Sequence, residues 1–402
     1  MNSRKDKLIE TYPIPWNQNQ INSFRVKLLD WYDQNKRDLP WRQTKNPYYI
    51  WVSEIMLQQT QVNTVIPYYL NFINTLPTIK DLAEVEEAKL MTLWQGLGYY
   101  SRVRNMQVAA QQIMQDFEGH MPQTVEELLK LRGIGPYTAG AIASIAFNQA
   151  EPALDGNLMR IVARFFEIDG DITLTATKNE MTALLYQMID PNRPGDFNQA
   201  LMDIGATIMT PTNDQPEDHP FSEFDQSYQN GTSHLYPVKK KKVKATDHYM
   251  LAYAIRNAKG QWLMRQHTDK ELLTGLWHFP LIEVNMVMEA TTQGELLEPL
   301  FNHLNEFDSL PMNLEDIKLK VPLDYNLLDG LNPFPEVKHV FSHRIWHVQV
   351  IPLIASKEID SELDAYQWFD IPALENLATS TLQKKLFNMI VTDRDHSIEM
   401  RK

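Results

Sequence analysis

The sequence predicts a two-domain protein in which an all-α domain is followed by an α+β domain. Apolar residues recur at intervals of three and four through residues 20–230, which is the period of amphipathic helices. After about residue 245, apolar and polar residues alternate, which is the period of strands. The length of 402 residues, with 43% apolar and 22% charged residues, fits two folded domains of ordinary composition.

The helical domain is expected over residues 1–230. Prolines separate its helical segments, and they are Pro40, Pro47, Pro77, Pro122, Pro136, Pro191 and Pro194. The segments with helical periodicity are NSFRVKLLDWY, VSEIMLQQTQVNTVIPYYLNFI, VEELLKL, TAGAIASIAF, GNLMRIVARFF and KNEMTALLYQMI. Residues 211–237 are polar, and we expect irregular structure there.

A basic linker is expected over residues 231–245, because it contains Lys239–Lys242 and Lys244. Such a run can contact phosphate, but a solvated connection between domains is the simpler interpretation. The α+β domain is expected over residues 246–402. HYMLAYAI and QWLMRQ flank a short polar turn and predict a β-hairpin. VKHVFSHRIWHVQVIPLIA predicts two further strands, and AYQWFDIPALENLA predicts a strand followed by a helix.

Charge and composition exclude several classes of protein. The net charge is −13, yet residues 1–160 contain 16 basic and 16 acidic side chains, whereas residues 161–230 contain 3 and 12. A polyanion should therefore contact the first segment and avoid the second. The absence of cysteine excludes disulfides, thiolate metal sites and cysteine-ligated iron–sulfur clusters. No apolar run is long enough for a membrane span, and MNSRKDKLIE lacks the apolar core of a secretory signal.

A glycine-rich connection between two helical stretches is the strongest local motif. It is Leu131-Arg132-Gly133-Ile134-Gly135 within residues 125–147, and a new helix is expected to start at Pro136. Closely spaced glycines expose backbone N–H groups, and the positive end of the following helix points the same way. This arrangement can bind a DNA phosphate without reading a base. The extended pattern LxGIGxxTAxAI is typical of a helix-hairpin-helix.

Two carboxyl groups stand in unusual positions. Asp155 precedes a helix that contains Arg160 and Arg164, where an aspartate could be an ordinary N-cap or could face the sugar of a nucleotide. Glu54 lies in the mostly apolar helix IWVSEIMLQQ, where burial should raise its pKa and let it act as an acid near neutral pH. A pair of carboxyl groups is what glycosidic bond cleavage requires.

With these motifs, the chain resembles the MutY-type adenine DNA glycosylases of the helix-hairpin-helix superfamily. The resemblance rests on LPWRQTKNPYYIWVSEIMLQQTQVNTVIPYY, WQGLGYYSRVRN, LRGIGPYTAGAI, PALDGNLMR and FNQALMDIGA, and on the later GLWHFP and VFSHRIWH. It spans roughly residues 20–395. It implies a helix-hairpin-helix glycosylase domain followed by a Nudix-like domain, and an enzyme that excises adenine mispaired with 8-oxoguanine or guanine during base excision repair.

The resemblance also implies roles for individual residues. Glu54 would protonate adenine at N7, and Asp155 would stabilise or capture the sugar cation, with Tyr137 and Asn157 orienting the two carboxyl groups. Related glycosylases that also cut the backbone carry a lysine at the position of Tyr137, so a monofunctional enzyme is expected. Without the resemblance, core packing of Tyr137 and capping by Asn157 would be equally plausible.

The remaining implied residues contact DNA or the flipped base. Gln58, Gln59 and Tyr99 would enter the base stack, and Arg132, Gly133 and Gly135 would hold the phosphate. Trp41, Arg42 and Gln199 would line the adenine pocket, although the role of Gln199 is less well supported by the pattern. Solvated surface for the glutamines and core packing for the tyrosine are the alternatives.

The chain departs from most relatives at the end of the helical domain. Met209, Pro216, His219 and Asp225 stand where the relatives carry the cysteines of an iron–sulfur cluster. No cluster can form, and His219 is expected to be a surface histidine. Because this segment is acidic, packing should replace the cluster and the hairpin should carry most of the DNA contact. No cofactor is expected to be required, but a monovalent cation at the hairpin is a further expectation.

The Nudix-like domain lacks the run of glutamates that holds Mg²⁺ in Nudix hydrolases, so it is expected to bind and not to hydrolyse. By resemblance, Phe341-Ser342-His343 forms a loop that probes 8-oxoguanine. Residues 383–387 (QKKLF) weakly match a sliding-clamp peptide, for which a chance amphipathic helix is the better interpretation. A cytoplasmic, nucleoid-associated monomer that binds duplex DNA is expected. The alternatives are a glycosylase for oxidised or mismatched pyrimidines and a non-enzymatic DNA-binding protein.

Overall fold

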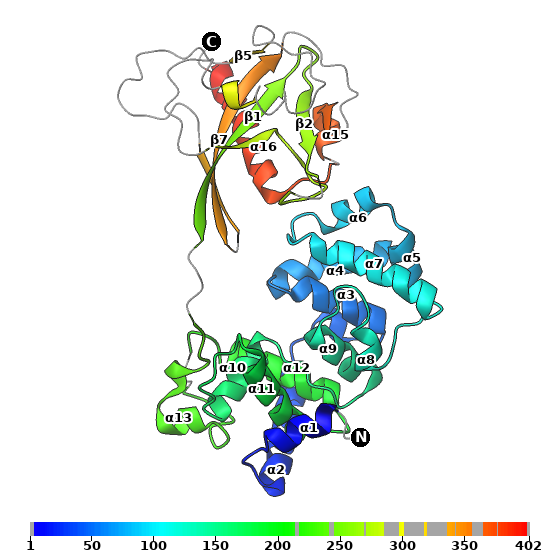
Figure 1. Ribbon diagram of the computed structural model, residues 1–402, viewed down its shortest axis with the longest axis vertical. Helices are drawn as coiled ribbons and strands as arrows, with labels where there is room; N and C mark the ends of the chain where they lie inside the picture. The colour runs from blue at the N-terminus through cyan, green and yellow to red at the C-terminus, as the bar shows by residue number, and fades with distance from the viewer. Residues whose placement is uncertain are drawn as a thin grey trace. The chain divides into compact units, whose positions relative to one another are not determined.

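The computed structural model describes residues 4–213, 217–240, 245–268, 271–284, 297–300, 317–319, 336–341, 343–355, 365–375 and 377–399 (Figure 1). The chain divides into two compact units. Unit 1 contains residues 1–85 and 101–241, and unit 2 contains residues 86–100 and 242–402. Among the described residues, no helix is both long and apolar enough to cross a membrane.

Unit 1 is helical, as the apolar periodicity predicts. Its α-helices are α1 (Arg4–Thr11), α2 (Gln18–Asn35), α3 (Pro47–Leu57), α4 (Val62–Thr75), α5 (Ile79–Glu84), α7 (Ser101–Asp116), α8 (Val125–Leu128), α9 (Pro136–Phe147), α10 (Gly156–Phe165), α11 (Thr175–Met188), α12 (Pro194–Thr207) and α13 (Gln226–Asn230). Two 3₁₀ helices, η1 (Pro40–Arg42) and η2 (Ser233–Leu235), complete it. The periodic stretch 52–73 proves to be two helices, α3 and α4, separated by a turn at residues 58–61.

Helix α9 lies at the centre of unit 1, where it packs against α3, α8 and α12. Its residues are nearly all apolar, and eight of them are buried. Two glycines permit the close packing. A Cβ atom on Gly140 would lie 2.1 Å from the carbonyl oxygen of Pro152, and one on Gly195 would lie 2.8 Å from Ile145. The chain leading to Asp155 is thereby held against α9.

A second core of unit 1 is formed by α2, α10, α11 and α12, together with Met209, Phe221 and Phe224. Aromatic rings fill it, and Phe24 packs edge-on against Phe165, Phe197 and Phe221 at centroid distances of 5.6, 6.1 and 6.0 Å. The same core includes Met209. Met209, at the first of the positions expected for cluster ligands, therefore belongs to a packed apolar core.

Unit 2 contains a mixed eight-stranded sheet and the helix α6 (Glu87–Trp94). The strands are β1 (Thr246–Arg256), β2 (Trp262–Gln266), β3 (Trp277–His278), β4 (Leu281–Val284), β5 (Ile317–Leu319), β6 (Glu336–Val340), β7 (Arg344–Ala355) and β8 (Tyr366–Phe369). Strands β1 and β7 are parallel, and every other pairing is antiparallel. The predicted β1–β2 hairpin, the β6–β7 pair and the strand at β8 are all confirmed.

Alternation along β1 sends side chains to two different cores. Met250, Ala252 and Ala254 face α16 (Thr381–Glu399), which covers this side of the sheet in Figure 1. Leu251, Tyr253 and Ile255 face the opposite side, together with the helical residues Leu297 and Leu300. The short helix α15 (Ile371–Glu375) follows β8, as predicted. The sheet is therefore covered on both faces, which is why apolar residues run continuously from Met250 to Ile255 and do not alternate with polar ones there.

Candidate active site

Helix α3 delivers one carboxyl group into the interior of unit 1. Asn46 caps its first turn by accepting a hydrogen bond from the Tyr48 N–H at 3.0 Å, and Pro47 occupies the first helical position. The Glu54 side chain is only 5% exposed. Burial raises the pKa of Glu54 to about 7. The hydrogen bond from Tyr137 and the charge of Arg42 oppose this rise, whereas the charge of Asp155 adds to it. The predicted rise in pKa is confirmed.

Tyr137, in the first turn of α9, is the direct partner of Glu54. Its hydroxyl group donates a short hydrogen bond to Oε2 of Glu54. Burial, together with the nearby charges of Glu54 and Asp155, raises the pKa of Tyr137 well above 10, so the phenol stays a donor. Since Oε2 accepts from Tyr137, the proton of the neutral acid belongs on Oε1.

Asp155 is the N-cap of α10. Its Oδ1 atom accepts from the Leu158 N–H at 2.8 Å, and its Oδ2 atom accepts from Nδ2 of Asn157 at 2.9 Å. Burial raises the pKa of Asp155, whereas these hydrogen bonds and the charge of Arg160 favour the ionised form. The structure thus brings together the four residues predicted to act on the sugar and the base.

Arg160 anchors this arrangement from the far side of Asn157. Its Nη2 atom donates to Oδ1 of Asn157 at 2.9 Å and to the Gly205 carbonyl at 2.6 Å, and its Nε atom donates to the Met209 carbonyl at 2.7 Å. A Cβ atom on Gly205 would lie 2.6 Å from Cβ of Asn157, so α12 approaches α10 this closely only with glycine there. A continuous series of hydrogen bonds therefore runs from Asp155 to Met209.

The expected adenine-pocket residues also lie in unit 1, where Trp41 and Gln199 are buried and Arg42 is partly buried. Arg42 donates to both oxygens of Asp203, at 2.5 and 2.8 Å, and its guanidinium lies over the ring of Tyr32. Trp41 is buried edge-on against Tyr69. Gln199 is also buried, and its Nε2 atom donates to the Gly195 carbonyl at 3.3 Å. Whether these side chains line an adenine pocket stays a prediction.

Two of the three residues expected to enter the base stack, Gln59 and Tyr99, have unusual backbone conformations. Gln58 is the C-cap of α3, and its Nε2 atom lies 3.5 Å from Oγ1 of Thr138. Gln59 follows with a φ of 60° and is exposed. Tyr99, in unit 2, has a φ of 50° and is 47% exposed. Non-glycine residues rarely adopt this left-handed conformation, and they do so most often at functional sites.

The helix-hairpin-helix is formed by α8, the predicted loop and α9. Gly133 has a φ of 78°, and a Cβ atom there would lie 2.7 Å from Cβ of Asn105, so glycine is required on both counts. Arg132 is exposed, with its Nε atom donating to Oδ1 of Asn105 at 3.2 Å. Gly135 is the N-cap of α9 and has open space around it. A cation at this hairpin remains a prediction.

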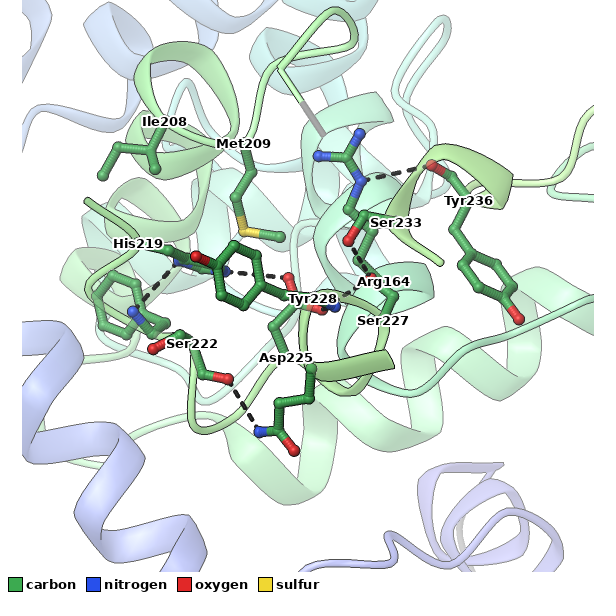
Figure 2. A network of polar contacts seen from close by, with 12 residues as sticks. Arg164, Ile208, Met209, His219, Ser222, Asp225, Ser227, Tyr228, Ser233 and Tyr236 are labelled. Atoms are coloured by element: carbon green, nitrogen blue, oxygen red, sulfur yellow. Dashed lines mark hydrogen bonds and ion pairs between the residues drawn. The ribbon is translucent and has the colours of Figure 1, made fainter. Parts of the chain in front are cut away.

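The segment expected to replace a cluster contains a buried polar network (Figure 2). The prediction that His219 lies on the surface is wrong, because it is only 8% exposed. Its Nδ1 atom accepts from the Phe221 N–H at 3.3 Å, so its Nε2–H group donates to Asp225 at 3.0 Å. Asp225 in turn accepts from Ser227 at 2.8 Å. These polar residues were expected to face water, but here they form hydrogen bonds with one another.

Further residues hold the same segment. Arg164 donates to the carbonyl oxygens of Thr210, Asn213 and Tyr236 at 3.2–3.4 Å. The hydroxyl groups of Ser227 and Ser233 lie 2.9 Å apart. Among the described residues, no group of three or more side chains could hold a metal ion. Pro216, the second position in the expected series, lies outside the described residues.

In unit 2, the loop expected to probe 8-oxoguanine joins β6 to β7. The Phe341 ring packs against Trp346 at 4.8 Å and against His339 at 4.7 Å, and the His343 carbonyl accepts from the Thr246 N–H at 3.2 Å. Ser342 lies outside the described residues. The QKKLF segment lies in α16, where Gln383 and Leu386 are buried. That burial agrees with the interpretation of this segment as an ordinary amphipathic helix.

The sequence analysis missed two side chains that organise the site. Asp203 is 1% exposed and binds both Arg37 and Arg42. Its signal was present, because a lone aspartate in LMDIGA has the same apolar surroundings that singled out Glu54. Arg102 donates to carbonyl oxygens at the end of α3. No side-chain pattern indicates a contact of that kind.

Residues 52–187 match the family described as HhH-GPD superfamily base excision DNA repair protein, and residues 251–389 match the NUDIX domain family. The adenine DNA glycosylase of Rattus norvegicus is 32% identical over 443 residues, covering 96% of this chain and 82% of the relative. That of Mus musculus is 34% identical over 435 residues, covering 95% and 80%. Among solved structures, a thermostable thymine-DNA glycosylase matches with a TM-score of 0.48 and 25% identity, covering 53% of this chain and 98% of that one.

Proposed function

The chain belongs to the adenine DNA glycosylase family, and from that premise we propose that it excises adenine paired with 8-oxoguanine, or with guanine, from duplex DNA. Action on adenine in base excision repair follows from the family. The observation that carries the proposed chemistry is Glu54, a buried acid whose pKa is about 7 and which receives a hydrogen bond from Tyr137.

In the proposed reaction, Glu54 donates the proton on Oε1 to the leaving adenine, at N7 by resemblance to the family. Because its pKa lies near neutral pH, a substantial fraction of the enzyme carries that proton when substrate binds. Tyr137 stabilises the carboxylate that remains, since its hydroxyl group already donates to Oε2.

Asp155 would stabilise the positive charge that develops on the sugar, or capture it transiently as a covalent ester. The donors from Leu158 and Asn157 hold its oxygens in a fixed orientation. Such preorganisation spares the site from reordering at the moment of reaction. Asn157 orients this carboxylate, and Arg160 in turn orients Asn157.

Strand cleavage is not part of the proposal. A lyase step needs an amine that forms a Schiff base with the sugar, and the hairpin position next to Glu54 is occupied by the hydroxyl group of Tyr137. The product would therefore be an intact strand with an abasic site. The proposal also includes no iron–sulfur cluster, because the chain has no cysteine and the segment is held by the His219–Asp225 network.

Recognition of the opposite base is assigned to unit 2. The β6–β7 loop that contains Phe341, Ser342 and His343 would contact 8-oxoguanine, with Ser342 bonding near its N7–H and O8. A Ser342→Ala variant should reduce the preference for 8-oxoguanine over guanine more than it reduces adenine removal itself. The proposed partner is duplex DNA. A contact with a sliding clamp through Gln383–Phe387 is not proposed, because Gln383 and Leu386 are buried and α16 would have to leave the core to make it.

The test is single-turnover base release from a duplex with one adenine opposite 8-oxoguanine, with and without alkali treatment. Parallel duplexes carry adenine opposite guanine, adenine opposite thymine, and an oxidised pyrimidine opposite guanine. Cutting only after alkali, at the mispaired adenine, is the expected result. Cutting at the pyrimidine lesion without alkali would assign the chain to the pyrimidine glycosylases. Binding without any base release would leave a non-enzymatic DNA-binding protein.

A further inference from the structure

Arg102, the second residue of α7, lies against the C-terminal end of α3. Its Nη1 atom is 2.8 Å from the Ile55 carbonyl oxygen, 3.4 Å from that of Met56 and 2.5 Å from that of Gln58. The Leu57 carbonyl oxygen accepts from the Thr60 N–H at 3.3 Å. Helix ends leave carbonyl groups without helical partners, and here all four carbonyls of residues 55–58 have a donor.

The turn after these carbonyls is strained. Gln59 has a φ of 60°, a left-handed conformation that is unfavourable for a residue with a Cβ atom. Such strain persists only where the surroundings hold it. The Gln58 carbonyl belongs to the peptide group immediately before Gln59, so the hydrogen bond from Arg102 fixes the orientation of that peptide group.

Charge supports the same placement. The carbonyl end of a helix carries a partial negative charge, which a cation in its last turn stabilises. The guanidinium of Arg102 is therefore matched to the end of α3 both as a donor and as a charge.

We propose that Arg102 is a positioning residue that holds the Gln58–Gln59 turn in the shape that enters the base stack when adenine leaves the duplex. This inference rests on the proposed function, because it assumes that the turn takes part in base flipping. The groups that shift the pKa of Glu54, after burial, are Tyr137, Asp155 and Arg42. Loss of Arg102 should therefore impair base flipping and leave the acid unchanged.

The main variant is Arg102→Gln, tested with a duplex that carries 2-aminopurine beside the target adenine. Fluorescence of the probe follows extrusion of the adenine, and alkali cleavage follows base release. Both should slow by about 10–100-fold, because small misplacements of a positioning element have effects of that size. The pH midpoint of base release should stay at its wild-type value. Arg102→Lys keeps the charge on a side chain one heavy atom shorter, so it should recover part of the loss.

Arg104→Gln is the matched control, because it removes the same charge from α7 two residues further on. It should leave adenine extrusion close to the wild-type rate. Equal losses in Arg102→Gln and Arg104→Gln would show a general charge effect and overturn the inference. Normal extrusion in Arg102→Gln, in an enzyme whose wild type releases adenine, would also overturn it. Absence of adenine release by the wild type would instead refute the proposed function.

A second comparison covers the case in which Arg102→Gln does not fold. Glycine adopts a positive φ without strain, so a Gln59→Gly background needs less support from Arg102. The slowing of extrusion by Arg102→Lys should therefore be smaller in that background than in the wild type. An equal slowing in both backgrounds would show that Arg102 does not act through this turn.

Discussion

The two units bury ionisable side chains in very different surroundings. In unit 1, Glu54 is buried beside a phenol that donates to it. In unit 2, His278 is fully buried, and neither of its ring nitrogens has a partner among the described residues. Its ring lies 4.8 Å from that of His267, whose Nδ1 atom also has none there. Burial shifts the pKa in both places, but the carboxyl group of Glu54 has a hydrogen-bond partner, whereas the ring of His278 has none among the described residues.

This difference in hydrogen bonding distinguishes a buried group that is arranged to act as an acid from buried groups that are only uncharged. Burial lowers the pKa of His267 to about 4 and that of His278 well below 6.5, so both rings are uncharged at neutral pH. His278 has no hydrogen-bond partner on either ring nitrogen among the described residues, and the carboxyl group of Glu271, which raises the pKa of His267, is already bound by Arg265. Glu54 has Tyr137 on one oxygen and Asp155 nearby, so we expect the same physical effect there to supply the proton for the proposed reaction.

The largest expected effect comes from breaking the chemistry of unit 1 while keeping its shape. Glu54→Gln retains an acceptor for Tyr137 but carries no transferable proton. Base release should fall by about 10²–10⁴-fold, which is the usual contribution of a general acid. Affinity for the mispaired duplex, measured by fluorescence anisotropy, should change little. A parallel loss of affinity and rate would contradict the role assigned to Glu54.

Stability gives the second test, because the partners in unit 1 depend on one another. Arg160→Met should destabilise the protein by about 3 kcal/mol, since the Gly205 and Met209 carbonyls lose donors at about 1–3 kcal/mol each. Chemical unfolding followed by tryptophan fluorescence measures the change. Arg193→Met is the control, because its ion pairs with Asp33 and Asp196 are partly exposed. Similar losses for the two variants would argue against a special role for burial.

The sequence indicated the helices and strands, and the burial of Glu54, better than it indicated the side chains that support them. Glu54 could be identified because an acid stands out in an apolar helix, and Asp203 carried the same signal unnoticed. Arg102 and Arg160 could not be identified in this way, because their partners include backbone carbonyls, which every residue carries. Their roles depend on which helix ends meet, and local patterns do not encode that.

His219 shows the opposite failure. The segment from 211 to 237 is polar, and polar composition ordinarily indicates exposure. The buried network of His219, Asp225 and Ser227 satisfies its own hydrogen bonds, so burial carries little penalty. Composition counts polar groups, but it does not tell whether they are arranged to bind one another.

The third prediction is that the two units respond to acid in opposite directions. The pKa of Glu54 in the folded state, about 7, exceeds its ordinary 4.5, so its contribution to stability is complete below pH 4.5 and is lost as pH rises through 7. The histidine pKa values lie below 6.5, so their contribution is complete above pH 6.5 and is lost as pH falls towards 4. Each group changes the free energy of unfolding by up to about 1.4 kcal/mol per pH unit.

Hydrogen exchange of the whole chain between pH 4.5 and 6.5, corrected for intrinsic rates, tests this prediction. Protection in β2 and β3 should fall with acid, and the Glu54→Gln variant should remove the acid-dependent gain in α3 and α9. Base release should also decline above pH 7, as Glu54 loses its proton. Parallel loss of protection in both units would contradict the contrast between them.

The smallest expected effect concerns the unpartnered ring. His278→Leu replaces a fully buried imidazole by an apolar side chain of similar volume, and it removes two nitrogens that have no partner among the described residues. An unsatisfied buried polar group costs about 1–3 kcal/mol, so partial repacking should leave a gain in stability of about 1 kcal/mol at pH 7. The fall in protection of β2 and β3 below pH 6.5 should become shallower, because one of the two neutral histidines is gone.

His234→Leu, at an exposed histidine in unit 1, is the control, and it should change neither the stability nor the pH dependence of protection. A clear loss of stability in His278→Leu would mean that a partner holds this ring. The two units would then differ only in which residues supply the hydrogen bonds to their buried ionisable groups.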